Sequence, residues 1–354
     1  MTHAGYRITG HSFLSLTIIY ASIIVNAYIE FIYRLHRIGV SPLCPSLLDK
    51  YYAIRIPILC NILYFVLALF LAQMGVAMAQ QCNTSGRMPT IFLPHGGGPM
   101  PILGAPSHKS LIKYLTGISK SVPKPTAILA VTAHWEADRV MVSTAEKPTM
   151  LYDYYGFPSE AYELQYQAPG SPTLAQRALS LLEAAGIPAA ADSKRGFDHG
   201  TFVPLMLAFP DATTPVVQMS LHKSMDPRLH LSVGAALAPL RDEGVLIVSS
   251  GMSFHNMGVF HTNGFGMGPS PRKYKPSEDF DSWLQQTVTG SVGAQRSELL
   301  AAWTESPGAR ECHPREEHLI PLMVAAGAAG EDAGRTDYSD WFIGTKVSGF
   351  MFGG

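Results

Sequence analysis

Three histidines follow short apolar segments of the kind that form buried strands. His95 ends TIFLPH, His134 ends AILAVTAH, and His255 lies six residues past Ser249, the end of VLIVS. In an open α/β sheet, ligands bind outside the carboxyl ends of the strands, so these side chains can converge. Imidazole is a ligand of zinc and iron, and three protein ligands with open positions are typical of a catalytic site. The three histidines are therefore candidate ligands of one divalent metal, although any one alone is more often a loop or core residue.

Two further histidines are candidates for the same site. His199 stands in GFDHG, a turn signal ahead of an apolar stretch, and His318 stands in PREEHLIPL, where Pro and acidic residues predict the first turn of a helix. From the residues alone, His318 could support the site or contact a substrate, and it could equally be a packed helix residue. The number of histidines in such positions strengthens the metal hypothesis.

Glycines and aromatic residues near these histidines have two interpretations each. The run Gly96-Gly97-Gly98 after His95 would let the backbone pass close to a metal or substrate, or it forms a plain turn. It lacks the GxxxxGK[ST] pattern of a phosphate-binding loop. The tyrosines and phenylalanine of 152–166 could form a wall for a planar substrate or simply pack in the core.

From Met88 onward, apolar β-rich segments alternate with helical patterns. This alternation predicts an α/β fold: a single three-layer α/β/α domain whose central sheet is largely parallel or mixed. Residues 261–276 are rich in Gly, Pro, Lys and Arg and predict a surface loop. The expected strands are 90–93, 127–132, 140–143, 215–220, 245–249 and 345–350, and the expected helices are 109–119, 172–185, 227–240, 278–289, 297–303 and 316–329.

Composition excludes several classes of protein. The chain has 354 residues, is 15% charged and has a formal net charge of -1. Its surface is therefore not basic overall, and we expect no nucleic-acid partner. Its 4 cysteines are too few for a disulfide scaffold. The sequence does not set the oligomeric state.

Residues 1–87 differ from the rest of the chain and form an N-terminal extension. They hold six Lys or Arg residues against two Asp or Glu residues, and two charge-free apolar runs at 12–29 and 56–80. These runs predict one or two apolar helices that associate with a membrane, with buried core helices as the alternative. An Ala-Met-Ala segment at 77–79 and an Asn-Thr-Ser sequon at 83–85 favour a membrane-anchored or lumenal protein. If the chain really starts near Met88, we expect a cytoplasmic protein.

Other catalytic chemistries find little support in the sequence. There is no GxSxG nucleophile elbow. Cys312 is the only thiol in 88–354 and has acidic neighbours, which disfavours a cysteine nucleophile. No local pattern marks a pair of catalytic carboxylates.

Nine segments together resemble the class III extradiol ring-cleavage dioxygenases, in that family's order and spacing. The nearest branch is that of the DOPA 4,5-dioxygenases, which is related to the catalytic subunit of protocatechuate 4,5-dioxygenase. The resemblance covers 88–354 and leaves 1–87 without a counterpart. The segments are PHGGGPM at 94–100, TAHW at 132–135, YDYYGFP at 152–158, YQAPGSP at 166–172, GFDHGTFVPL at 196–205, FPDA at 209–212, PVVQMSL at 215–221, LRDEGVLIVSSGMSFHN at 240–256 and PREEHLIPL at 314–322.

The resemblance implies a role for each histidine. His95, His134 and His255 match the family's metal ligands, and His199 matches the histidine that acts as general base or acid. His318 falls where the family has a histidine near the substrate. The implied cofactor is one divalent metal per chain, Fe(II) for the oxygen chemistry, with Zn(II) often found in this branch. One departure is visible, because the serine usual after the first His-Gly is Gly97 here.

The function implied by the resemblance is metal-dependent extradiol cleavage of a small, DOPA-like or other catechol. Both atoms of O2 enter the product, a muconic-semialdehyde-type compound. Two alternatives stay open at this point. A zinc-dependent hydrolase could use the same three-histidine site to activate water, and a metal-free member of the fold could bind peptides. A binding module, however, would need none of the histidines.

Overall fold

The computed structural model describes residues 86–266 and 271–354. The predicted apolar helices at 12–29 and 56–80, and with them the predictions of membrane association and localisation, lie outside the described residues. In the described part of the chain, no helix is both long enough and apolar enough to cross a bilayer.

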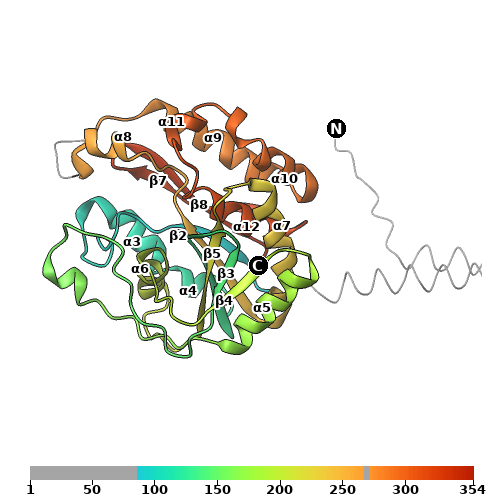
Figure 1. The fold of residues 1–354 in the computed structure, drawn as a ribbon. Coiled ribbons are helices and arrows are strands. Elements are labelled where there is room, and N and C mark those ends of the chain that lie inside the picture. Colours follow the sequence, from blue (N-terminus) through green and yellow to red (C-terminus); the bar gives the residue numbers. More distant parts are fainter. Residues whose placement is uncertain (1–85, 267–270) are drawn as a thin grey trace, which may run out of the picture. The chain divides into compact units, whose positions relative to one another are not determined.

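Within the described residues, eight strands form one mixed sheet in the order β4-β3-β5-β2-β6-β1-β8-β7 (Figure 1). The central neighbours β5, β2, β6 and β1 are parallel. Antiparallel pairs flank them, β8 with β1 and β7 at one side and β3 with β5 at the other. The strands are β1 (Thr90–Pro94), β2 (Ala127–Ala137), β3 (Val140–Ser143), β4 (Ala189–Asp192), β5 (Val216–His222), β6 (Val245–Gly251), β7 (Gly334–Phe342) and β8 (Thr345–Phe352).

Helices in the described ranges connect these strands and surround the sheet (Figure 1). Short 3-10 turns complete the connections, among them η2 (Ser159–Tyr162) and η4 (Gly264–Gly266). The α-helices are α3 (Lys109–Leu115), α4 (Ile118–Ser121), α5 (Pro172–Ala184), α6 (His199–Ala208), α7 (Pro227–Leu237), α8 (Met257–Thr262), α9 (Lys275–Gly290), α10 (Gly293–Ala301), α11 (Ala309–Cys312) and α12 (Ile320–Ala329).

Hydrogen bonds from the central strands show that helices cover both faces of the sheet. Thr90 of β1 pairs with Ile247 of β6, and side chains alternate along a strand, so Thr90 and Ser250 point to opposite faces. The Thr90 hydroxyl donates to the carbonyl of Ala325 in α12 at 2.8 Å, whereas the Ser250 hydroxyl donates to the carbonyl of Gly200 in α6. α12 and α6 therefore lie on opposite sides of the sheet, as a three-layer arrangement requires.

Helix α12 is buried at every position, and it crosses α7 at very short range. A Cβ added at Gly327 would lie 2.0 Å from the carbonyl oxygen of Leu231, and one added at Gly234 would lie 2.1 Å from that of Val324. Both contacts are with backbone atoms, which cannot rotate away. The two glycines thus permit a helix crossing that no larger residue would allow.

The α/β class, the mixed sheet and the six expected strands are confirmed by the structure. Two strands, β4 and β7, were not expected, because the Ala-rich β4 and the polar β7 lack an apolar β-rich pattern. The prediction of a surface loop over 261–276 was too broad. α8 continues to Thr262, a 3-10 turn comes after it, and α9 begins at Lys275.

We predict that Gly327→Ala destabilises the protein by about 1–3 kcal/mol, because the added methyl group overpacks the α7–α12 crossing. Gly290→Ala is the matched control, since no heavy atom lies within 4 Å of a Cβ at that helical position. The free energy of unfolding, measured with urea, should fall for the first variant only. Equal stability of the two variants would contradict the crossing.

Candidate functional site

His95 follows β1 directly and is fixed by the end of the neighbouring strand β6. Its backbone N–H donates to the carbonyl of Gly251 at 3.1 Å, and its ring Nδ1 lies 3.0 Å from the hydroxyl oxygen of Ser250. The residue is 1% exposed. Burial, together with the neighbouring histidines, lowers the pKa of His95 well below its usual range, so the ring is neutral.

His134 lies in β2, where the pairing with β5 shifts register between Val131 and Glu136. Such an irregularity turns a side chain away from the regular alternation. The Nε2 of His134 lies 3.1 Å from the Nε2 of His95. Burial, and then the nearby His199, lowers the pKa of His134 as well. Two neutral imidazoles therefore face each other through their ring nitrogens.

His199 is the first residue of α6, and its position depends on two carboxylates. Asp198 caps the helix by accepting from the backbone N–H of Thr201 at 3.1 Å, and it also accepts from the hydroxyl of Thr132 in β2 at 2.8 Å. Asp153 accepts from both the backbone N–H and the ring Nδ1 of His199, at 3.0 Å and 2.7 Å. The ring of His199 lies 3.8 Å, centroid to centroid, from that of His134.

His255 and His318 form a stacked pair that shares one carboxylate. Their ring centroids are 3.5 Å apart, with an angle of 17° between the planes. The Oε1 of Glu317 lies 3.2 Å from the Nδ1 of His255 and 3.0 Å from the Nδ1 of His318. The other oxygen of Glu317, Oε2, is buried without a hydrogen-bond partner among the described residues. A single carboxylate thus orients two imidazoles.

The five imidazoles form one continuous cluster, but their nitrogens fall into two groups. The ligand atoms of His95, His134 and His199 all lie within 4.8 Å of one another, and so do those of His255, Glu317 and His318. His318 links the groups, because its ring centroid is 5.2 Å from that of His95 and 4.8 Å from that of His134. The structure therefore brings His95 and His134 together with His199, and His255 joins them through its stacking on His318.

The hydrogen-bond partners leave the nitrogens of this cluster suited to a metal ion. Ser250, Asp153 and Glu317 engage the Nδ1 atoms of His95, His199, His255 and His318, so Nε2 is the second nitrogen that each of these rings can offer to a metal ion. Metal-binding histidines have this second hydrogen bond almost always. The 3.1 Å between the Nε2 atoms of His95 and His134 is also the spacing of two nitrogens that bind one ion at about 2.1 Å, near a right angle. The donor set therefore fits a divalent metal.

The two carboxylates of the site stay ionised. Burial, the largest single influence, would raise the pKa of Asp153, but the side-chain and backbone hydrogen bonds from His199, together with the charges of His199 and His134, lower it overall. The same balance holds for Glu317, where burial would raise the pKa but the hydrogen bond with His255, with the charges of His255 and Arg315, lowers it overall. Asp153 and Glu317 thus accept from the Nδ1–H groups as anions and stabilise any positive charge on the rings.

Asp153 and Glu317 were missed by the sequence reasoning, although both lie in segments that it singled out. Asp153 stands among the aromatic residues of YDYYGFP, and Glu317 stands next to His318 in PREEHL. An acidic residue flanked by aromatic residues, or adjacent to a candidate histidine, is a usable signal, because a buried imidazole needs an acceptor for its second nitrogen.

The glycines after His95 form a turn that packs against His108 and Phe157. Gly96 and Gly98 have positive φ angles of 84° and 50°. A Cβ at Gly96 would lie 2.9 Å from the ring of His108, and one at Gly98 would lie 3.0 Å from the ring of Phe157. The turn therefore needs glycine both for its backbone conformation and for close packing.

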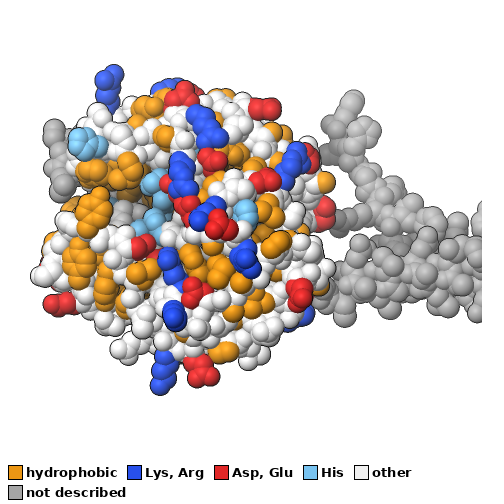
Figure 2. Space-filling model, viewed as in Figure 1, with side chains coloured by type: hydrophobic (Ala, Val, Ile, Leu, Met, Phe, Trp, Pro, Cys, Tyr) orange, Lys and Arg blue, Asp and Glu red, His pale blue; other side chains and the backbone are white. Residues whose placement is uncertain are grey.

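The histidine cluster reaches the protein surface. Figure 2 shows histidine side chains in a hollow on one face, with apolar side chains gathered beside it. The side chains of His134 and His255 are 21% and 20% exposed. A small molecule can therefore reach the cluster from solvent.

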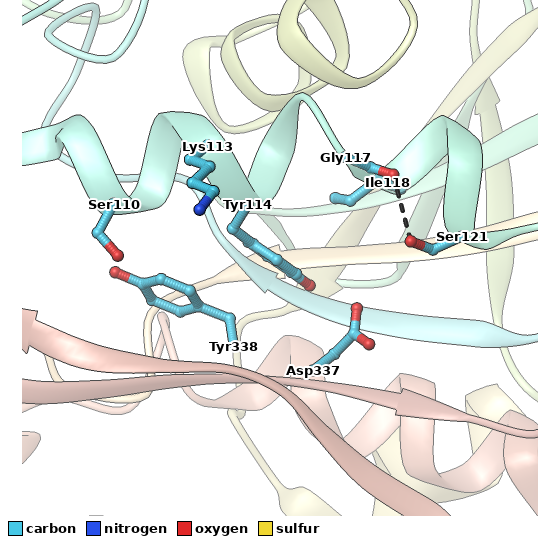
Figure 3. Close-up of a pocket in the computed structure, with 8 residues that line it drawn as sticks. All are labelled: Ser110, Lys113, Tyr114, Gly117, Ile118, Ser121, Asp337 and Tyr338. Carbon is cyan, nitrogen blue, oxygen red and sulfur yellow. Dashed lines mark hydrogen bonds between the residues drawn. The ribbon is translucent and has the colours of Figure 1, made fainter.

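A separate cavity of about 340 Å³ lies between α3 and β7. Figure 3 shows Lys113 and Tyr114 of α3 opposite Asp337 and Tyr338 of β7. The rings of Tyr114 and Tyr338 stack with their centroids 5.0 Å apart. No histidine of the described ranges lines this cavity, so it is distinct from the candidate site.

Comparisons with known proteins agree with this geometry. The family described as the catalytic LigB subunit of aromatic ring-opening dioxygenase matches residues 89–345. A dioxygenase of Hapsidospora irregularis, tasH, is 39% identical over 76% of this chain and 86% of its own length. The 4,5-DOPA dioxygenase extradiol of Beta vulgaris is 39% identical over 69% of this chain and 88% of its own length.

Bacterial proteins show the same relationship. The 4,5-DOPA dioxygenase extradiol of Escherichia coli K12 is 35% identical over 69% of this chain and 86% of its own length. A crystal structure of an uncharacterized protein from Escherichia coli K12 is similar with a TM-score of 0.61 and 31% identity, covering 75% of this chain and 100% of that chain. The chain belongs to the LigB family of class III extradiol ring-cleavage dioxygenases, and its reaction is the metal-dependent opening of an aromatic ring.

Proposed function

We propose that residues 88–354 open the ring of a catechol beside its diol, with insertion of both atoms of O2. One divalent ion, Fe(II), would be held by His95, His134 and His255, with His199 as acid and base and His318 beside the substrate. The observation that supports this most strongly is the 3.1 Å approach of the Nε2 atoms of His95 and His134. Beside it, the Nδ1 contacts of His95, His199, His255 and His318 leave Nε2 as the second nitrogen on each of these rings.

A bound divalent ion lowers the pKa of the diol hydroxyls, and as Fe(II) it adds redox chemistry with O2, which zinc lacks. The protein's part is to bind and orient the diol beside this position. The partly exposed rings of His134 and His255 allow a planar diol to approach. The buried His95 and His318 exclude water behind it.

We infer that His199 moves the proton of the diol. Its Nδ1 donates to Asp153 at 2.7 Å, so its Nε2 carries the lone pair that accepts a proton. The carboxylate of Asp153 then stabilises the imidazolium that forms. When the ring opens, the same Nε2 returns the proton to a departing oxygen.

His318 fits a role in holding the substrate. The Nδ1 of His318 lies 3.0 Å from the Oε1 of Glu317, which orients the ring. The ring centroid of His318 lies 4.8 Å from that of His134 and 5.2 Å from that of His95. An Nε2 fixed in this way can accept a hydrogen bond from a substrate hydroxyl. Burial, and then the neighbouring His255, lowers the pKa of His318, so the ring binds as a neutral group.

We predict that the full-length chain, loaded anaerobically with Fe(II), consumes O2 when a catechol is added and forms a yellow product. The Zn(II)-loaded chain should bind catechol, observed as a change in the catechol ultraviolet spectrum, but consume no O2, since zinc has no redox chemistry. An oxygen electrode and a spectrophotometer record both results. Hydrolysis of an ester or amide without O2 uptake would instead support the hydrolase alternative.

We predict that His134→Ala and His255→Ala lose the metal and the ring-opening activity together, because each removes a ligand. His199→Ala should retain the metal but lower kcat about 10²- to 10⁴-fold, the typical contribution of a general acid or base. Metal content per chain is measured by atomic emission, beside O2 uptake. Loss of the metal in His199→Ala would mean that His199 is a fourth ligand.

We predict that Asp153→Asn lowers kcat roughly tenfold or more while KM for catechol changes little. The amide still reaches His199 but cannot stabilise an imidazolium as a carboxylate does. Asp153→Glu, which keeps the charge, should recover part of kcat. Steady-state kinetics and metal content distinguish this positioning role from general damage. A rise in KM with unchanged kcat would place Asp153 in substrate binding.

A further inference from the structure

Exposed apolar side chains concentrate beside the histidine cluster. Among the described residues, six large hydrophobic side chains are exposed, and four of them lie in two short segments, 155–162 and 257–265. Both segments start next to the site, since Asp153 precedes the first and His255 precedes the second. We call 155–162 the aromatic lip and 257–265 the α8 lip. The exposed residues on them are Tyr155, Tyr162, Met257 and Phe265.

The aromatic lip is anchored to the site by Tyr154. The ring of Tyr154 lies 5.8 Å from that of His199 and 5.4 Å from those of Phe157 and Tyr162. Its hydroxyl donates to the carbonyl of Ala161 at 2.5 Å, which closes the loop. Tyr155, which follows this anchor, is nevertheless 91% exposed. The lip is therefore held in place by Tyr154 and carries one aromatic ring, that of Tyr155, that is exposed to solvent.

The α8 lip is anchored from the other side. Asn256 caps α8 by accepting from the backbone N–H of Gly258 at 3.0 Å, and its amide donates to the carbonyl of Glu311 at 2.8 Å. Phe260 is buried, with its ring 6.4 Å from that of His255. Met257, at the start of the same helix, is 54% exposed. Methionine is flexible and polarizable, and it suits contact with apolar ligands of varied shape.

Two arginines beside the cluster, Arg195 and Arg315, form ion pairs with the protein's own carboxylates. Arg195 donates to Asp198 at 3.0 Å and to the carbonyl of His134 at 3.0 Å. Arg315 makes a two-pronged ion pair with Glu136, at 2.7 Å and 2.5 Å. A substrate carboxylate at this site would meet two engaged guanidinium groups. It would have to compete with Asp198 and Glu136 for these guanidinium groups.

We propose that the catechol that this chain cleaves carries an uncharged, apolar alkyl or aryl substituent, which lies between the aromatic lip and the α8 lip. The proposal rests on the ring-cleavage function proposed above and names its substrate class. A charged amino-acid side chain, as in DOPA, is disfavoured because nearby arginines are engaged and the lips offer apolar contacts. The two lips closely follow Asp153 and His255 of the site along the chain. The substituent of a diol bound at the site is therefore the group that we assign to the lips.

The test compares catechols of increasing apolar length on the Fe(II)-loaded full-length chain. Catechol, 4-methylcatechol, 4-butylcatechol, 4-phenylcatechol and DOPA are assayed by O2 uptake. The ratio kcat/KM should rise roughly two- to fourfold per buried methylene, mostly through a lower KM. DOPA should be at least tenfold poorer than 4-butylcatechol. If DOPA equals or exceeds 4-butylcatechol while catechol is cleaved, the inference is wrong and the proposed function stands.

Single-residue variants test whether the substituent contacts the two lips. Tyr155→Ala and Met257→Ala should reduce the preference for 4-butylcatechol over catechol by about threefold or more, since each removes apolar surface from one lip. Leu299→Ala is the matched control, because Leu299 is exposed on α10, outside both lips, and the preference should stay unchanged. An unchanged preference in both lip variants would overturn the assignment.

Two further outcomes are distinguished by the same set of proteins. If none of the diols, including catechol itself, consumes O2 with Fe(II) bound, the proposed function fails before the substituent is tested. Light scattering shows whether a second copy of the chain covers the lips. A dimer that Met257→Glu converts to a monomer, with no effect of substituent length on kcat/KM, would overturn the substrate assignment in favour of an interface between copies.

Discussion

The site depends on one physical constraint, which is that several imidazole nitrogens lie close to one another in a buried space. Nitrogens 3.1 Å apart, as in His95 and His134, could not both carry a proton and a charge there. Burial, and then repulsion from neighbouring imidazoles, lowers the pKa of both rings, which keeps them neutral. Acceptors outside the cluster then fix which nitrogen faces inward. Neutral rings with fixed orientation are what a divalent ion requires of its ligands.

The fold meets this constraint by drawing the rings from both helical layers to one end of the sheet. His199 begins α6 on one face, and the turn that carries His318 precedes α12 on the other. That turn is locked to β6, because the carbonyl of His318 accepts from the backbone N–H of Met252 at 2.9 Å. A Cβ at Gly251 would lie 2.1 Å from the same carbonyl oxygen. Close backbone packing, with no side chain between, therefore sets the position of His318.

Sequence reasoning finds the features that depend on local pattern alone. Strands such as β2 and β6 begin with continuous apolar segments, and the histidines that come shortly after these segments, His134 within β2 and His255 beyond β6, stand out in the sequence. It missed β7, whose alternating polar residues suit a strand at the edge of the sheet. It also missed Asp153, whose partner His199 lies 46 residues away. A contact between two loops depends on how the layers of the fold pack, and the spacing of residues along the chain does not indicate that packing.

The charges of the site determine what kind of molecule it can take. Asp153 and Glu317 stay ionised, and the pKa of His95, like that of His134, is lowered, so two carboxylates place negative charge beside neutral rings. A divalent ion balances this charge. A neutral diol that gives its proton to His199 leaves the net charge of the site unchanged. A substrate with charged groups would bring additional charges into a partly buried site, with no opposite charge to compensate them. Arg195 and Arg315 serve the protein's own carboxylates, which leaves apolar contact as the basis of selectivity.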